Sequence, residues 1–153
     1  MTMPLPIFPQ QPDETTILQP AVVTFLGGKN INTYIVNGLF DLLLSSSITR
    51  SDSYLEIKVR LQTQQYKCPI TPAQWRLLNG HDPASPFEAN YRVLIYDQQN
   101  GGQYALATAS NLRNGITANE PNDTSYITTA CLKALAWAKP NVISQHLLAW
   151  VHR

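Results

Sequence analysis

The sequence contains few charged residues for its length. Asp, Glu, Lys and Arg make up only 14% of its 153 residues, against roughly 25% in an ordinary soluble domain. Charge keeps a lone monomer dispersed in water, whereas surfaces between subunits are depleted in Lys, Glu and Asp. The shortage of charge therefore favours a protein whose surface is largely covered by other subunits.

Further absences narrow the class of protein. The net charge is only +1, so the chain has no strongly basic balance of the kind that points to nucleic acid. No apolar run approaches the roughly 20 residues that span a bilayer. The N-terminus also lacks the basic start and apolar stretch of a secretion signal. We therefore expect no nucleic-acid partner, no membrane and no signal-directed secretion.

Cysteine and histidine are scarce as well. The chain has two cysteines, Cys68 and Cys131, and three histidines. The cysteines lie far apart in the sequence, and we expect two free thiols. None of the spacings matches a clustered ligand set, so we predict no metal site and no cofactor.

The first 20 residues differ from the rest because proline is concentrated there. This density favours extended backbone and disfavours a helix. Three apolar side chains on this segment, Leu5, Ile7 and Phe8, suit docking against a neighbouring subunit. We predict an extended N-terminal arm over residues 1–20 and a single α+β domain over residues 21–153.

The next segments contain a strand and an ambiguous stretch. Residues 21–26 are apolar, rich in β-branched side chains and end at two glycines, which predicts a strand. Residues 31–44 carry apolar side chains at helical spacing, but Asn37-Gly38 is a strong hairpin signal. We favour a helix over 31–44 and keep the hairpin as the alternative.

The clearest strand covers residues 54–62, where apolar and polar side chains alternate. Leu55, Ile57, Val59 and Leu61 predict the buried face, and Glu56, Lys58, Arg60 and Gln62 the opposite face. We interpret the charged face as a solvated sheet surface rather than as a binding patch.

The rest of the chain predicts both helices and strands. Thr71 and Gln74 form a capping box that predicts a short helix, and residues 91–96 and 104–109 predict a hairpin around Gly101. A helix from residue 124 or 125 to 139 and a last helix after Pro140 follow. The expected fold is α+β, a mostly antiparallel sheet of four to five short strands with the C-terminal helices packed on one face.

No group of residues carries a convincing catalytic signal. His81-Asp82 can orient an imidazole, and Cys68 is a conceivable nucleophile, but neither has a partner that the sequence places nearby. We assign no catalytic residue. Tyr54, Tyr66 and Trp75 suit a subunit interface together with the arm residues. A stacking platform for single-stranded nucleic acid is the less favoured interpretation of these aromatic residues.

We therefore predict a structural subunit of a larger assembly, a bacteriophage capsid, neck or tail component, and not an enzyme. Its expected partners are further copies of the chain or neighbouring virion proteins, in a virion or a host cytoplasm. A small interaction module that binds one protein partner is the alternative. An enzyme with an unrecognised site is the third possibility.

Overall fold

The structure is a computed structural model that describes residues 17–60, 68–78, 90–113, 115 and 125–153. Its larger elements, in chain order, are α1 (Gln19–Leu26), β1 (Ile31–Ile35), β2 (Leu42–Ser46), β3 (Asp52–Arg60), α2 (Pro72–Leu78), β5 (Tyr91–Asp97), β6 (Gln103–Thr108) and α6 (Pro140–Val151). The shorter ones are β4 (Pro69–Ile70), η2 (Gln98–Asn100), α4 (Ala109–Arg113), β7 (Ser125–Tyr126) and α5 (Thr129–Ala134).

A five-stranded sheet in the order β1-β2-β3-β5-β6 forms the centre of the fold. The β1–β2, β2–β3 and β5–β6 pairs are antiparallel, while β3 and β5 run parallel. The prediction of an α+β fold with four to five strands is confirmed, but the sheet is mixed rather than mostly antiparallel. A parallel pair needs a crossover, and the chain between β3 and β5 supplies it through α2.

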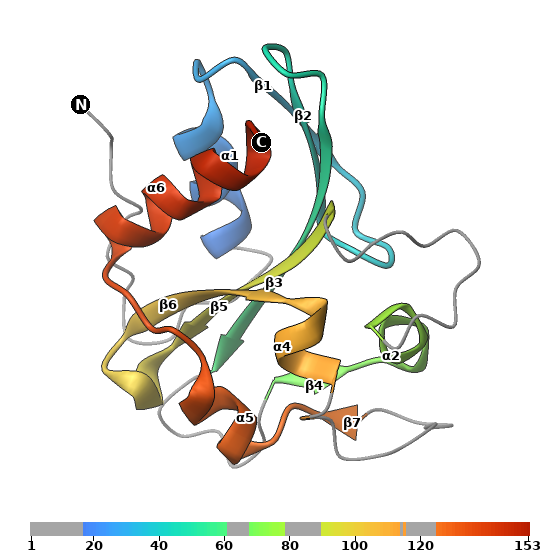
Figure 1. The fold of residues 1–153 in the computed structure, drawn as a ribbon, viewed down its shortest axis with the longest axis vertical. Helices are drawn as coiled ribbons and strands as arrows, with labels where there is room; N and C mark the ends of the chain where they lie inside the picture. The colour runs from blue at the N-terminus through green and yellow to red at the C-terminus, as the bar shows by residue number, and fades with distance from the viewer. Residues whose placement is uncertain (1–16, 61–67, 79–89, 114, 116–124) are drawn as a thin grey trace.

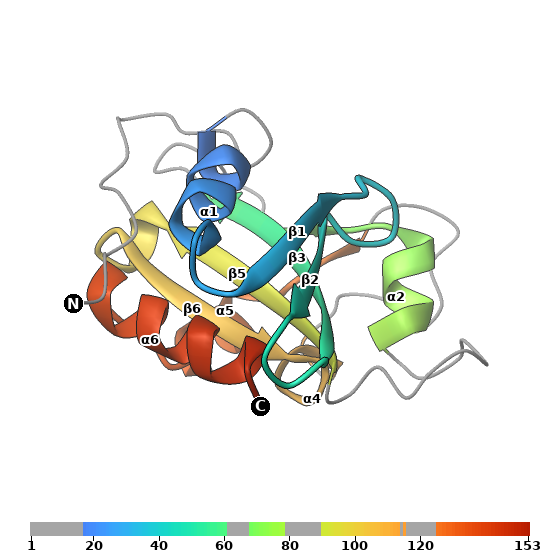
Figure 2. The ribbon, with the colours of Figure 1, turned by 90° about the horizontal axis from the view of Figure 1, so that it is seen from above.

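Helices cover both faces of this sheet (Figure 1). One core cluster joins α1 and α6 to the face of β3 that carries Leu55, Ile57 and Val59. A second cluster joins α2, α4 and α5 to the other face, through residues such as Trp75 and Leu132. Seen from above, α1 and α6 lie in front of the strands (Figure 2). The prediction that the C-terminal helices share one face is wrong, because α5 and α6 belong to different clusters.

Residues 21–26 form part of α1 and not the predicted strand. Pro20 occupies the first turn of this helix, where its missing N–H costs nothing. Leu18, Val22, Phe25 and Leu26 are buried at helical spacing, and this stripe outweighs the β-branched composition. Residues 1–16 of the predicted arm lie outside the described residues.

Residues 31–44 form the β1–β2 hairpin, so the favoured helix is wrong and the alternative is confirmed. Asn37 adopts a left-handed backbone with φ 50°, a conformation that asparagine tolerates better than most residues. Leu42 and Leu44 are fully buried on alternate positions of β2. The hairpin therefore buries the same apolar side chains without a glycine inside a helix.

Other local predictions are confirmed. The capping box is present, since the Gln74 N–H donates to Thr71 Oγ1 at 3.2 Å and the Thr71 N–H donates to Gln74 Oε1 at 3.2 Å. The predicted hairpin forms from β5 and β6. Both cysteines are free thiols. Within the described part of the chain, no helix is long and apolar enough to cross a membrane.

Candidate active site

Charged side chains of β3 face inward rather than toward water. Glu56, Lys58 and Arg60 expose only 5%, 7% and 6% of their surface. Their face of β3 is the one that α2 covers, which contradicts the predicted solvated sheet face. Burying a charge is costly unless it is paired, so each of these groups requires an explanation.

Asp41 lies next to Glu56 because of how β2 joins β3. The Asp41 N–H donates to the Leu55 carbonyl at 3.0 Å, and the Ile57 N–H donates to Asp41 Oδ2 at 2.7 Å. These two bonds clamp Asp41 against β3 directly before β2 begins. Asp41 as a whole residue is half-buried.

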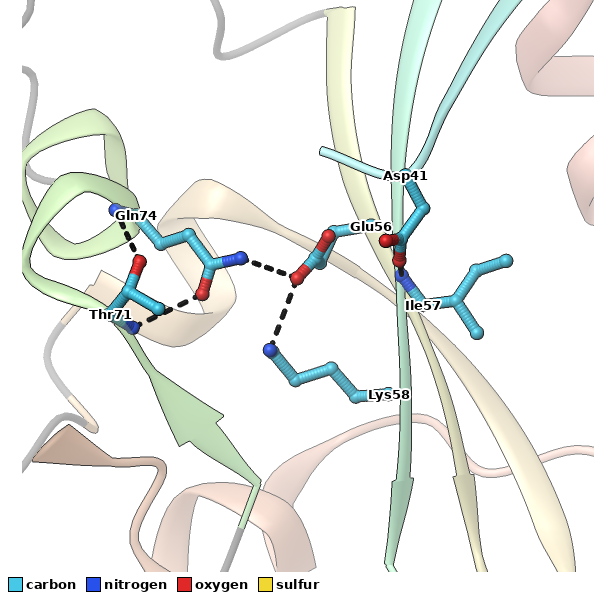
Figure 3. A network of polar contacts seen from close by, with 6 residues as sticks. All are labelled: Asp41, Glu56, Ile57, Lys58, Thr71 and Gln74. Carbon is cyan, nitrogen blue, oxygen red and sulfur yellow. Dashed lines mark hydrogen bonds and ion pairs between the residues drawn. The ribbon is translucent and has the colours of Figure 1, made fainter. Parts of the chain in front are cut away.

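Glu56 lies between Asp41, Lys58 and Gln74 (Figure 3). Lys58 Nζ donates to Glu56 Oε2 at 3.1 Å, and Gln74 Nε2 donates to the same oxygen. The other carboxylate oxygen, Oε1, is buried and has no hydrogen-bond partner. A buried acceptor without a partner costs free energy, and here it is located beside a second carboxylate.

The electrostatics of this cluster favour an added positive charge. The pKa of Glu56 is raised from 4.5 to about 7. Burial is the largest cause, and Lys58 opposes it. The charge of Asp41 adds to the rise, as does a hydrogen bond to Asp41 that only the protonated Glu56 carboxyl can donate. The pKa of Tyr91 is also raised, first by burial and then by the charges of Glu56 and Asp41. A cation between the carboxylates would relieve this repulsion.

The neighbouring ion pair between Arg60 and Asp97 is different. Arg60 Nη2 lies 2.8 Å from Asp97 Oδ2, and Arg60 Nε donates to both oxygens of Asp97. The Gln99 N–H and the Asn100 side chain also donate to Asp97. Every oxygen of Asp97 is thus satisfied, so this pair has the properties of a structural tie. Glu56, in contrast to Asp97, has a carboxylate oxygen without a partner.

The residues at this site fit a hard divalent cation such as Mg²⁺. Such ions prefer oxygen ligands and are commonly held by one or two carboxylates together with water and substrate phosphate. Glu56 offers an oxygen without a partner, and Asp41 offers a second carboxylate beside it. These two side chains are the ones that would hold the ion.

The residues predicted to form an interface are only partly described. Trp75 is buried in the second core cluster, and Tyr54 is half-buried against it. The structure thus brings Tyr54 and Trp75 to the same side of the sheet. Leu5, Ile7, Phe8 and Tyr66 lie outside the described residues, and an interface role for all six stays a prediction.

The chemical candidates weighed from the sequence are not found in this cluster. Cys68 is buried in the second core cluster, and His81-Asp82 lies outside the described residues. His146 on α6 is exposed.

The sequence analysis assigned no functional role to Asp41, Glu56 or Lys58. It assigned the side chain of Gln74 a capping role and nothing more. A signal for them was present: Glu56-Ile57-Lys58 places an acid and a lysine on the same face of one strand. Asp41 directly precedes β2, the strand before it. We interpreted these charged residues as a solvated sheet face, because alternation alone does not show which face of a sheet is covered.

Comparison with known proteins gives a likeness in structure and none in sequence. No family model matches the chain, and no curated protein does. The fold is similar to that of Hjc, a Holliday junction resolvase from the archaeal hyperthermophile Archaeoglobus fulgidus, with a TM-score of 0.51 and 11% identity. The match covers 87% of this chain and 97% of that chain. At this identity the likeness shows the fold.

The likeness contradicts the prediction of a structural virion subunit from a bacteriophage, and the prediction that the chain is not an enzyme. The error has a physical source, because low charge was attributed to covered subunit surfaces. In the structure, some of the few charges are inside, around Glu56 and Asp97.

Proposed function

We propose that this protein is a divalent-metal-dependent nuclease that hydrolyses phosphodiester bonds in DNA. The observation that carries the proposal is the buried carboxylate of Glu56, with one unpartnered oxygen, beside Asp41 and Lys58. The likeness to a Holliday junction resolvase supports DNA as the substrate class. The proposal replaces the sequence-based expectation of no metal and no cofactor.

Each residue has a distinct role in this proposal. A divalent cation at the site supplies a Lewis acid for the phosphate and lowers the pKa of water. Asp41 and the ionised form of Glu56 hold that charge on the face of β3. Gln74 orients the Glu56 carboxylate through its side-chain amide. The ammonium group of Lys58, 3.1 Å from Glu56 Oε2, provides positive charge where the phosphate becomes more negative.

The overall hydrolysis balances without any other reactant. A water oxygen forms a bond to phosphorus, and the bond from phosphorus to one sugar oxygen breaks. One proton of the water ends on the leaving sugar oxygen, and a phosphate monoester remains on the other fragment. Neither oxidant nor nucleotide is consumed.

Three substitutions test the proposal directly. Asp41→Asn and Glu56→Gln keep the size of each side chain but remove the charge that holds the cation, so DNA cleavage in Mg²⁺ should fall below detection. Lys58→Met should lower the rate by on the order of 100-fold. Cleavage of end-labelled single-stranded, duplex and branched DNA, measured by gel electrophoresis with Mg²⁺, Mn²⁺ or EDTA, provides the readout.

Asp52→Asn is the matched control, because Asp52 is an exposed acid on the same strand. It should cleave like the wild type. The proposal is wrong if the wild type cleaves none of these substrates with either metal. It is equally wrong if Asp41→Asn cleaves as fast as Asp52→Asn.

Oligomerisation and location remain parts of the proposal. A homo-oligomer is supported by the low charge of 14% and by exposed apolar side chains such as Ile35 and Val36. Action on DNA would place the protein where DNA is accessible, in a cytoplasm. The solution mass by light scattering tests the first point.

A further inference from the structure

A row of large side chains crosses the sheet beside the candidate active site. Tyr34 on β1 pairs with Leu43 on β2, Leu43 pairs with Tyr54 on β3, and Tyr54 pairs with Tyr91 on β5. Directly paired residues project from the same face of a sheet. Because Tyr54 and Glu56 are two positions apart on one strand, the whole row shares the face of the carboxylates.

The exposure of this row increases toward the edge of the sheet. Tyr91 is 1% exposed, Tyr54 is half-buried and Tyr34 is 54% exposed. Phe40, one residue before Asp41, is half-buried and packs against Tyr54, with ring centroids 4.8 Å apart. We call Tyr34, Phe40 and Tyr54 the aromatic shelf. Its inner part is fixed by packing, and its outer ring stands open to solvent.

The shelf lies within reach of a strand bound at the carboxylates. Two residues along a strand span about 7 Å, and two neighbouring strands span about 10 Å, so Tyr34 lies about 12 Å from the position of Glu56. Successive phosphates of one duplex strand advance by about 3.4 Å along the axis. Tyr34 therefore meets the substrate within about four nucleotides of the reacting phosphate.

Tyr34 is better suited to stacking on a nucleic-acid base than to binding a phosphate. Aromatic side chains bind nucleic acid by stacking on base faces, and in a continuous duplex those faces are covered by neighbouring bases. The chain has only 11 Lys and Arg against 10 Asp and Glu, which leaves little charge to track two phosphate backbones. Stacking on bases contributes binding free energy that does not depend on this small number of positive charges.

We propose that the aromatic shelf stacks on an unpaired base next to the cleaved bond, so that the enzyme prefers nucleic acid with unpaired bases. The inference rests on the proposed function for the meaning of the neighbouring carboxylates. It specifies the substrate class: single strands, flaps and branch points rather than continuous duplex.

Binding to matched oligonucleotides tests the shelf separately from cleavage. A fluorescently labelled thymidine 12-mer and an abasic 12-mer carry the same phosphates, and only the former has bases. In EDTA, where no cleavage occurs, anisotropy should show that the full-length wild type binds the thymidine oligomer roughly tenfold more tightly. Tyr34→Ala should abolish this preference, and Tyr34→Phe should retain it because the ring remains.

Ile48→Ala is the control, because Ile48 is 65% exposed and follows β2 at the end opposite Asp41. It should bind like the wild type. The inference is overturned if Tyr34→Ala keeps the preference for bases, or if Tyr34→Ala and Ile48→Ala lose it equally. It is also overturned if Tyr34→Ala lowers the solution mass without changing the preference, because Tyr34 then belongs to a subunit contact.

The two proposals fail in different experiments. A preference for bases that depends on Tyr34, in a protein that cleaves nothing with Mg²⁺ or Mn²⁺, would refute the nuclease and leave the shelf as a nucleic-acid binding surface. Cleavage that depends on Asp41, with identical binding of the two oligomers, would refute the shelf and retain the nuclease.

Discussion

Glu56 is a buried carboxyl group with a raised pKa and one oxygen without a partner. Only 5% of its surface is exposed, on a strand that also carries a buried lysine, and its pKa is raised from 4.5 to about 7, chiefly by burial. A structural ion pair does not need this arrangement, as the fully satisfied Asp97 shows. A perturbed carboxyl with unused acceptor capacity is characteristic of functional sites.

The raised pKa of Glu56 predicts how cleavage depends on pH. Only the ionised carboxylate holds a cation, so at limiting Mg²⁺ the rate should rise with pH through about 7 and then level off. Initial rates between pH 5.5 and 8.5 test this. Saturating Mg²⁺ should move the midpoint to lower pH, because the cation competes with the proton. A rate that falls as the pH rises through 7 would contradict the assignment.

Without metal, the stability of the fold should decrease as the pH rises, whereas the cleavage rate should increase. Between pH 4.5 and about 7 the folded protein keeps a proton on Glu56 that the unfolded chain has released, so the free energy of unfolding falls as the pH rises. Glu56→Gln removes this titration. Urea unfolding in EDTA measures this free energy at pH 5 and at pH 8. Its decrease between the two pH values should be smaller in Glu56→Gln than in the wild type, by on the order of 2 kcal/mol.

At the scale of elements, one residue of α2, Gln74, both caps the helix and contacts the candidate site. Gln74 serves the capping box through its side-chain oxygen and Glu56 through its side-chain nitrogen. The register of this helix therefore fixes where the amide reaches the carboxylate. The capping box was predictable from the sequence, but the contact with Glu56 was not, because it depends on the packing of α2 on the sheet.

Two substitutions in α2 separate these roles. Thr71→Ala removes a cap and should cost about 1 kcal/mol of stability with little change in the Mg²⁺ concentration for half-maximal cleavage. Gln74→Ala also releases Glu56, and should raise that concentration by roughly tenfold or more, as loss of an orienting partner does at other metal sites. Equal Mg²⁺ requirements in the two variants would show that Gln74 only caps the helix.

The elements that were predicted correctly are those with local causes. The β5–β6 hairpin has Gly101 with φ 74° at its turn, and α2 has its capping box. The segment 31–44 was wrongly favoured as a helix because its apolar spacing fits both periods. The outcome was decided by β2 pairing with β3, which no local pattern shows.

At the scale of the whole molecule, metal binding and folding should be coupled. An ion that binds only the folded state stabilises it, by about 2.7 kcal/mol at a concentration 100 times its dissociation constant. For a chain of this size the midpoint of thermal unfolding should rise by roughly 5 °C in saturating Mg²⁺. Asp41→Asn should show no such rise in scanning calorimetry. A rise of the same size in Asp41→Asn would place the ion elsewhere.

The candidate site was harder to predict than the fold class because it is defined by burial. The predicted helices and strands together correctly indicated an α+β fold, and the alternation over residues 54–62 correctly indicated the strand β3 (Asp52–Arg60). That Glu56 and Lys58 face a covered side of the sheet depends on the parallel β3–β5 pairing and on α2. Without that information the same residues look like an ordinary wet surface.

The β2–β3 hairpin brings Asp41, Glu56 and Lys58 together within one short stretch of chain, whereas the groups that desolvate them come from distant segments such as α2 and β5. The spacing of these three residues and the raised pKa of Glu56 are therefore encoded in different parts of the sequence. Substitutions in α2 alone are accordingly expected to shift the pKa of Glu56 while the residues of the β2–β3 hairpin stay the same.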